Sequence, residues 1–161
     1  MNVLIRTLLF TVLVPGTVTV AVPRLLLPSG ANFTLNGSGI LGTLLIVLGA
    51  TAYVRCVWNF TFSGKGTPAP IDPPKTLVSR GLYRIVRNPM YIGIGCILLG
   101  ESVAFSSYVL LWYAVGFLVF AHLFVLLYEE PALTKKFGPS YEEYRKTVPR
   151  WTPRLLPRRR K

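Results

Sequence analysis

Polar and charged side chains gather at two places in an otherwise apolar part of this 161-residue chain. The first place is the basic, turn-rich segment 81–91, which contains Arg87 and Asn88. The second is the carboxylate pair Glu129 and Glu130, at the end of the second apolar run that follows. Guanidinium groups bind anions and carboxylates bind cations, so the two clusters together suit a small zwitterionic ligand that carries a positive centre.

The two clusters meet only if the apolar runs between them fold back on each other. Asn88-Pro89 predicts the start of a helix that ends near Ala104, because proline suits the first helical turn. Segment 105–108 predicts a tight turn, and a second helix is expected over 109–128. Antiparallel neighbours joined by a short connection place both clusters at the same membrane face. Pro131, directly after the acids, predicts that the second span ends there, at the interface.

Composition places these helices in a membrane. The chain is 52% hydrophobic and has a mean hydropathy of +0.49, with long uncharged runs at 3–22 and 39–62 in addition to the hairpin. The expected fold is all-α: a polytopic membrane helical bundle of about four transmembrane helices, with a C-terminal helical hairpin and a short cytosolic C-terminal region. A cleaved signal peptide is the alternative for the first run. A retained span, kinked at Pro15 and followed by a loop over 23–38, is favoured because the basic region before it is thin.

The net charge of +12 is concentrated beside the apolar runs. This pattern fits the positive-inside rule and predicts an inner or cytoplasmic membrane protein with both termini in the cytoplasm. The basic end 158–161 is interpreted as a topology signal or a clamp for anionic lipid headgroups. We expect no nucleic-acid partner, because base-stacking aromatics and nucleic-acid motifs are missing from the basic stretches. Cys56, Cys96 and His122 lie apart in apolar runs and predict no metal site.

Length predicts one integral-membrane domain, 1–161. It divides into two anchoring spans (1–62), a Pro/Gly-rich cytosolic loop (63–88), the ligand-binding hairpin (89–130), and a cytosolic helix with a basic tail (131–161). A short interfacial helix is expected over 77–86. Gly39, Gly42 and Gly49 predict close helix packing in the second span. Gly138 predicts a helix stop before the helix that carries Tyr141 and Tyr144 on one face.

Three motifs in order give the C-terminal half a recognisable pattern. They are Gly81-x-Tyr83-Arg84-x-x-Arg87-Asn88-Pro89-x-Tyr91-x-Gly93, then Glu129-Glu130-x-x-Leu133-x-x-x-Phe137-Gly138-x-x-Tyr141-x-x-Tyr144, then Val148-Pro149-Arg150-Trp151. In order and spacing this pattern resembles the isoprenylcysteine carboxyl methyltransferase and phospholipid methyltransferase superfamily. The loop Gly66-Thr67-Pro68-x-Pro70 is similar to that of its bacterial members. The first two spans carry no such resemblance.

The resemblance implies an integral-membrane enzyme that uses S-adenosyl-L-methionine, whose sulfonium is a positive centre. Carried over by position, it implies a cofactor site made of Arg87, Asn88, Pro89, Tyr91, Gly93, Gly95, Glu129, Glu130, Tyr141 and Tyr144, with catalytic roles for Arg87, Glu130 and Arg150 and no metal. Many eukaryotic members have His at the position of Asn88. Asn cannot act as a base, so Asn88 is expected to orient the cofactor.

Methyl transfer is a displacement, so the protein contributes mainly positioning and desolvation. A prenylcysteine-like carboxylate acceptor needs no base. A phospholipid amine must lose a proton, which Glu129, Glu130 or His122 can accept. The alternatives to a methyltransferase are a non-catalytic membrane protein with a lipid- or partner-binding tail, and a membrane reductase of similar helical layout. The acceptor and the oligomeric state stay open.

Overall fold

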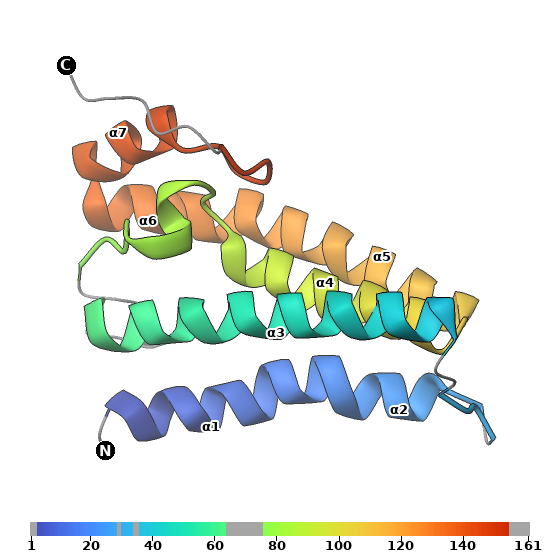
Figure 1. The fold of residues 1–161 in the computed structure, drawn as a ribbon. Coiled ribbons are helices and arrows are strands. Elements are labelled where there is room, and N and C mark those ends of the chain that lie inside the picture. Colours follow the sequence, from blue (N-terminus) through green and yellow to red (C-terminus); the bar gives the residue numbers. More distant parts are fainter. Residues whose placement is uncertain (1–2, 29, 34–35, 64–75, 155–161) are drawn as a thin grey trace.

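The computed structural model describes residues 3–28, 30–33, 36–63 and 76–154, and its secondary structure within these ranges is helical (Figure 1). In chain order the helical elements are α1 (Val3–Gly16), the π-helical turn η1 (Thr17–Ala21), α2 (Val22–Leu26), α3 (Gly37–Ser63), the 3₁₀ turn η2 (Gly81–Arg84), α4 (Pro89–Ala104), α5 (Tyr108–Phe124), the π-helical turn η3 (Val125–Glu129), α6 (Glu130–Phe137) and α7 (Pro139–Thr147). The Pro/Gly-rich segment 64–75 and the basic end 158–161 lie outside the described residues.

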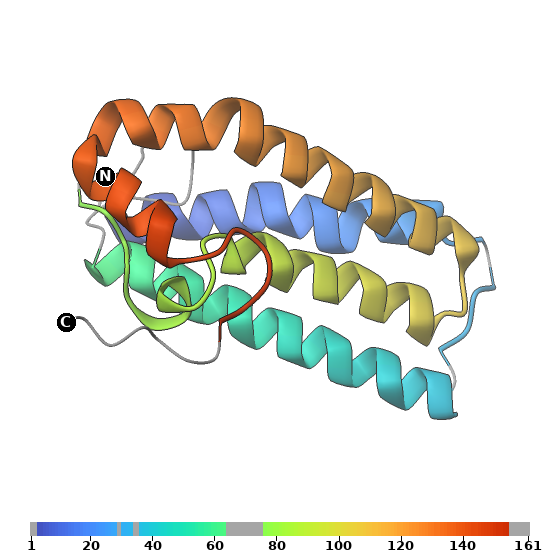
Figure 2. The ribbon, with the colours of Figure 1, turned by 90° about the horizontal axis from the view of Figure 1, so that it is seen from above.

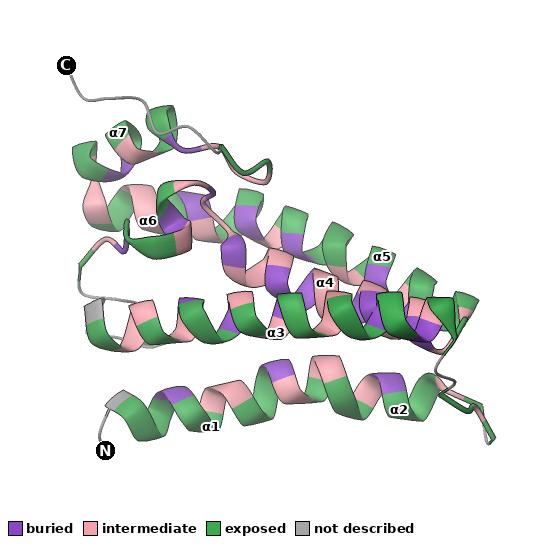
Figure 3. Ribbon diagram, in the orientation of Figure 1, coloured by how far each residue is buried: buried purple, intermediate pink, exposed green. Residues whose placement is uncertain are grey.

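The long helices form an elongated bundle. α4 lies between α3 and α5, and the first helical segment (α1, η1 and α2) packs against all three (Figure 1, and Figure 2 from above). The start of α1, the end of α3, α6 and α7 share one end of the bundle. Buried residues concentrate on α4, whereas much of the surface of α3 and α5 is exposed (Figure 3). Apolar side chains facing outward are typical of a protein whose solvent is lipid.

Helix length and composition agree with the predicted membrane bundle. Three helical segments are long and apolar enough to cross a bilayer: Leu4–Leu26, Gly37–Phe62 and Tyr108–Phe137. The fourth predicted span, Pro89–Ala104, is apolar but shorter. Its 16 residues give a length of about 24 Å, against a hydrocarbon core of about 30 Å. The protein is therefore an integral-membrane helical bundle in which α4 is the short, central helix.

The first span is longer than predicted. The helix continues through Pro23 to Leu26, so the prediction of a loop that begins at residue 23 was wrong. Pro23 lies in the first turn of α2, where its missing N–H costs nothing. Between Pro15 and Pro23 the π-helical turn η1 loosens the backbone. The hydroxyl of Tyr113 on α5 donates a hydrogen bond of 2.9 Å to the Val18 carbonyl there, which satisfies a backbone acceptor in this turn.

Glycines bring the α3 and α4 backbones into contact at two points, as the small residues of the second span predicted. A Cβ atom at Gly42 would lie 2.5 Å from the Gly100 carbonyl oxygen. A Cβ atom at Gly49 would meet the Gly93 carbonyl oxygen even more closely. Because both obstacles are backbone atoms of α4, a side chain can be added only by moving the helix. The glycines therefore set the α3–α4 distance.

We expect Gly49→Ala to destabilise the protein by about 1–3 kcal/mol, because one methyl group at this contact forces the two helices apart. Gly116→Ala on α5 is the matched control, since no atom lies within 4 Å of the added Cβ. Alanine favours a helix over glycine, so the control should be neutral or slightly stabilising. Thermal unfolding in detergent measures both. Equal melting temperatures for the two variants would contradict the assigned contact.

The hairpin forms where it was predicted, but its second arm does not end at Pro131. α4 begins at Pro89 and ends at Ala104, and the Ser107 hydroxyl caps α5 by accepting the Leu110 N–H. The helix then continues through η3 and α6 as far as Phe137. The π-helical turn places Pro131 in the first turn of α6, where a missing N–H is tolerated. The two acids therefore lie within a helix rather than at its end.

The predicted helix over 77–86 is also wrong, since it is reduced to the 3₁₀ turn η2. Arg80 is extended and Gly81 has φ +58°, a left-handed conformation that interrupts a helix. The predicted stop at Gly138 is confirmed, because it separates α6 from α7 with φ +51°. Val78 and Tyr83 are buried against Cys56 of α3. The loop is therefore held on the bundle end by packing instead of helical hydrogen bonds.

Candidate functional site

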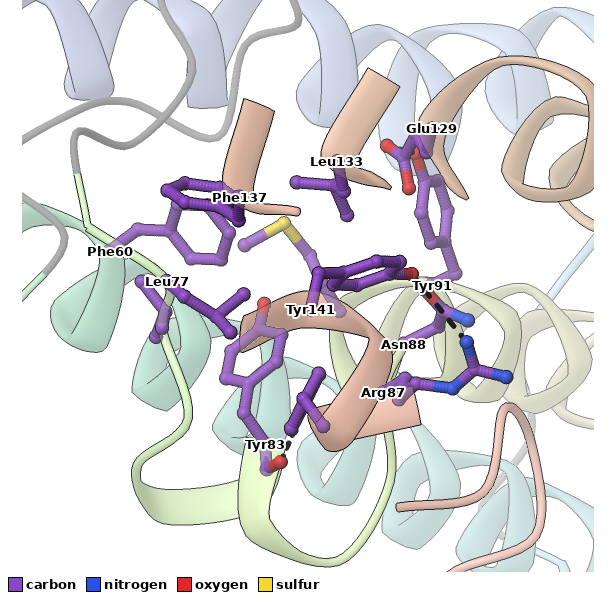
Figure 4. Close-up of a pocket in the computed structure, with 13 residues that line it drawn as sticks. Phe60, Leu77, Tyr83, Arg87, Asn88, Tyr91, Glu129, Leu133, Phe137 and Tyr141 are labelled. Carbon is purple, nitrogen blue, oxygen red and sulfur yellow. Dashed lines mark hydrogen bonds between the residues drawn. The ribbon is translucent and has the colours of Figure 1, made fainter. Parts of the chain in front are cut away.

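A cavity of about 100 Å³ lies at the bundle end, between the end of α3, the segment before α4, and helices α6 and α7 (Figure 4). Apolar side chains such as Phe60, Leu77 and Phe137 lie towards one end of it, and Arg87 and Glu129 lie towards the other. The residues that line it are Phe60, Leu77, Val78, Tyr83, Arg87, Asn88, Met90, Tyr91, Glu129, Leu133, Phe137, Tyr141 and Tyr144. The cavity is thus amphipathic, with opposite charges at its polar end.

Glu129 is the carboxylate that lines the cavity in the described part of the chain. It is the last residue of η3 and faces α4, where the Tyr91 hydroxyl donates a hydrogen bond of 2.5 Å to Oε1. Among the described residues, Tyr91 is the donor seen on this carboxylate. A carboxylate held by a single phenol in an apolar surrounding attracts a cationic group strongly, because few protein charges nearby neutralise it.

Arg87 supplies the opposite charge. Its side chain is only 9% exposed, and Nη1 contacts Glu130 Oε1 at 2.9 Å and donates to the Tyr141 hydroxyl at 3.5 Å. Its Nε is buried and finds no acceptor among the described residues. A buried donor without an acceptor is costly, so this N–H is a candidate ligand contact.

Glu130 lies behind Arg87 and does not line the cavity. It is 5% exposed, and both of its carboxylate oxygens are bonded to Arg150, Oε1 to Nε at 2.7 Å and Oε2 to Nη2 at 2.9 Å. The hydrogen bonds from Arg150 to Glu130 raise the pKa of Arg150, which is therefore a permanent cation. Arg87, Glu130 and Arg150 form a compact ion triad.

Two tyrosines of α7, Tyr141 and Tyr144, line the cavity. The Tyr144 hydroxyl donates a hydrogen bond of 2.7 Å to the carbonyl of Tyr83 in η2. Burial raises the pKa of both Tyr144 and Tyr83, so both phenols stay protonated and act as donors. Tyr83 also packs edge-on against Phe60 of α3, with ring centroids 5.4 Å apart. η2 is thereby tied to α3 on one side and to α7 on the other.

Residues 148–154, after α7, form a non-helical segment with several bends, which we name the C-terminal strap. It pairs with the segment before α4 through two backbone hydrogen bonds, from the Arg87 N–H to the Pro149 carbonyl and from the Arg154 N–H to the Ile85 carbonyl, each 2.9 Å. The Asn88 side-chain amide donates to the Arg150 carbonyl at 3.2 Å. The strap therefore holds the turn before α4 in place from behind.

The structure brings together most of the residues that the sequence analysis proposed. Six of them line the cavity: Arg87, Asn88, Tyr91, Glu129, Tyr141 and Tyr144. Glu130 and Arg150 lie directly behind Arg87. Three lie at helix contacts instead: Pro89 is buried at the start of α4, Gly93 faces α3 at Gly49 and Tyr53, and Gly95 faces Leu118 of α5. The ligand contacts of all these residues remain predictions.

The sequence analysis missed the apolar wall of the cavity. Two of its members, Leu133 and Phe137, follow Glu129 at four-residue spacing and thus share its helix face. The spacing would have predicted that these two residues share a face with Glu129 if the helix had been expected to continue through Pro131. Phe60, Met90 and Leu77 carry no comparable signal, because they resemble ordinary packing residues of a membrane bundle.

An apolar helical bundle with a small amphipathic cavity and paired charges at one end defines a membrane protein with a candidate site for a charged small molecule. Comparison with known proteins identifies the family. The phospholipid methyltransferase family model matches residues 38–140, which is more than half of the chain, so the chain belongs to that family. The match covers α3 to α6 and therefore most of the residues that line the cavity.

Two curated relatives are similar over about half of the chain. One is the protein-S-isoprenylcysteine O-methyltransferase of Schizosaccharomyces pombe, 39% identical over 83 residues, which is 50% of this chain and 34% of the relative. The other is methanethiol S-methyltransferase 2 of Bradyrhizobium diazoefficiens, 34% identical over 79 residues, 49% of this chain and 29% of the relative. The matches thus span about a third of the length of these relatives. No solved structure matches the chain significantly.

Proposed function

We propose that this protein is an integral-membrane methyltransferase that transfers a methyl group from S-adenosylmethionine to a lipophilic acceptor. The observation that supports this most directly is the pair of opposite charges at the cavity, the Arg87 guanidinium with its unpaired Nε and the Glu129 carboxylate. The family and the two methyltransferase relatives give the reaction class.

The chemistry of the lining residues fits S-adenosylmethionine. Its amino-acid end carries an ammonium and a carboxylate, which suit Glu129 and Arg87 respectively. Its adenine ring is flat and aromatic, which suits the wall formed by Phe60, Leu133 and Phe137. The unpaired Arg87 Nε is the strongest single sign of fit, because an anionic ligand group would satisfy a buried donor.

When bound, S-adenosylmethionine supplies an electrophilic methyl group on a sulfonium. The protein's own residues bind, orient and desolvate. Glu129, fixed by Tyr91, would bind the positively charged group of the ligand at one point of the cavity. Arg87, fixed by Glu130 and Tyr141, would bind the negatively charged group at another. The apolar wall excludes water. Such positioning accounts for most of the acceleration expected for a displacement reaction.

We propose that the acceptor is an anionic nucleophile on a lipophilic molecule that enters from the bilayer. The names of the relatives point to a prenylcysteine carboxylate and to a thiol, and a carboxylate or thiolate needs no base. An amine acceptor must transfer its proton, and Glu129 is the carboxylate available for this in the described lining.

Calorimetry with detergent-purified protein tests the cofactor, and radiolabelled methyl transfer tests the acceptor. We expect saturable binding of S-adenosylmethionine and S-adenosylhomocysteine. Farnesylcysteine, a long-chain thiol and phosphatidylethanolamine then report carboxylate, thiol and amine acceptors. Binding without transfer to any acceptor would favour a non-catalytic role. Binding of a nicotinamide nucleotide in place of both adenosyl ligands would favour the reductase.

We further propose that the site faces the cytoplasm and that both termini lie there, in the inner membrane. The start of α1 and the end of the described chain lie at the same end of the bundle as the cavity (Figure 1). A single cysteine in place of the exposed Ser140, with the native cysteines replaced, should react with a membrane-impermeant maleimide only in inverted vesicles. Reaction in right-side-out vesicles would reverse the orientation.

A further inference from the structure

We infer that Glu130 is a positioning residue that fastens the C-terminal strap behind Arg87, and that Glu129 alone of the two acids contacts the ligand. This assignment rests on the proposed function. It gives different roles to two acids that the family resemblance treats as one pair. It also gives the strap, residues 148–154, a defined part in the site.

The two carboxylates differ in how many protein donors are already bonded to them, and this difference separates their roles. Glu130 is 5% exposed, and its oxygens accept bonds from Arg150 and Arg87 at 2.7, 2.9 and 2.9 Å. Little of its acceptor capacity is left for a ligand, and it does not line the cavity. Glu129 lines the cavity and carries a single phenol on Oε1.

The strap acts on the cavity through two of its lining residues. Pro149 accepts the backbone N–H of Arg87 at 2.9 Å, and the carbonyl of Arg150 accepts the side-chain amide of Asn88 at 3.2 Å. The guanidinium of Arg150 is in turn bonded at two points to Glu130 on α6. A chain of bonds therefore runs from Glu130 through the strap to the backbone of Arg87 and the amide of Asn88.

A direct bond completes the arrangement. Glu130 holds Nη1 of Arg87, and the Tyr141 hydroxyl accepts from the same nitrogen. With Nη1 fixed on two partners, the guanidinium plane is fixed and the direction of the unpaired Nε–H is set. Glu130 thus orients the donor that we assign to the ligand carboxylate, without touching the ligand.

The strap has a second anchor that does not involve the acids. The Trp151 indole N–H donates to His122 Nδ1 on α5 at 3.0 Å, with ring centroids 6.0 Å apart. This contact gives the lone histidine a structural role. It also gives an independent way to loosen the strap, because His122 lies about two helical turns from the acids.

A double-mutant cycle on Glu130 and Arg150, read by S-adenosylhomocysteine affinity, tests the inference. We expect Glu130→Gln and Arg150→Gln each to weaken binding by about tenfold, and the double variant to bind like Glu130→Gln alone. The reason is that in the Glu130→Gln variant Arg150 has already lost the carboxylate with which it pairs. Losses that multiply in the double variant would overturn the inference, since Glu130 would then affect ligand binding independently of the bond by which Arg150 fastens the strap.

Two further variants keep the test informative if the Gln variants fold poorly. Arg150→Lys retains the charge but loses the two-point bond and should weaken binding in the same direction. His122→Phe removes the second anchor while leaving the ion triad intact, and should also weaken binding, by a few-fold. Unchanged affinity in both variants would show that strap position does not matter to the ligand, which contradicts the inference.

Hydrogen exchange on ligand-free protein separates this inference from the proposed function. The Arg87 and Arg154 amides are bonded to the strap and the turn, respectively. We expect both to exchange faster in Glu130→Gln and in Arg150→Lys than in the wild type, whereas Glu142→Gln on the exposed face of α7 leaves them unchanged. Unchanged exchange refutes the fastening even if the cofactor binds. Faster exchange in a protein that binds no adenosyl ligand supports the fastening and refutes only the proposed function.

Discussion

Glu129→Gln should weaken the binding of S-adenosylhomocysteine by about 10- to 150-fold, the effect of losing one hydrogen bond between charged groups. The substitution keeps the shape of the side chain, and its carbonyl oxygen can still accept the Tyr91 hydroxyl, 2.5 Å from Oε1 in the wild type. The fold should therefore survive. What is lost is the negative charge at the polar end of the cavity, where little else compensates a cationic ligand group.

The ligand can be varied to show which group Glu129 binds. 5′-Methylthioadenosine lacks the whole amino-acid end, so its affinity should be the same in the wild type and in Glu129→Gln. Equal losses for both ligands would instead place Glu129 at the ribose. Glu142→Gln is the matched control for the removal of one negative charge, because Glu142 is exposed on α7 and outside the cavity. Calorimetry with each purified variant supplies the affinities.

Sequence patterns predicted the fold wherever composition and local chemistry acted in the same direction. Apolar runs of membrane length, a proline at the start of α4 and glycine at 138 gave the helical bundle and its main boundaries. The small residues Gly42 and Gly49 correctly indicated close packing. Two of the errors arose at Pro23 and Pro131, which were interpreted as helix ends. Each lies instead in the first turn of a helix that follows a π-helical turn, and a π-helical turn has no sequence signature of its own.

The residues of the site could be predicted, but the separate roles of Glu129 and Glu130 could not. Spacing predicted that Arg87, Asn88 and Tyr91 lie at the same end of the hairpin as Glu129 and Glu130, and the structure brings them together at one end of the bundle. Adjacent acids on a helix point in different directions, about 100° apart. Which of them faces the cavity depends on the turn η3, and which is paired depends on a strap that returns from residue 150. Both are tertiary features, so the motif alone could not distinguish Glu129 from Glu130.

Arg87→Lys tests the other charge of the cavity and should lower S-adenosylmethionine affinity by about 10- to 150-fold although the net charge is unchanged. A lysine ammonium can replace one bond to Glu130, now 2.9 Å from Nη1. It has no counterpart of the buried Nε–H, the donor that finds no acceptor among the described residues. If that N–H binds the carboxylate of the cofactor, charge retention cannot rescue binding, because a point charge does not reproduce the fixed fork of a guanidinium.

Decarboxylated S-adenosylmethionine provides the decisive comparison, since it keeps the sulfonium and the amine but has no carboxylate. Its affinity should be low in the wild type and nearly the same in Arg87→Lys, because the group that Arg87 binds is already missing. Arg84→Lys on the exposed side of η2 is the matched control and should bind both ligands like the wild type. An equal loss for both ligands in Arg87→Lys would mean that Arg87 shapes the cavity through Glu130 and Tyr141 without contacting the carboxylate, and the two charges of the site would then have to be assigned to other groups of the ligand.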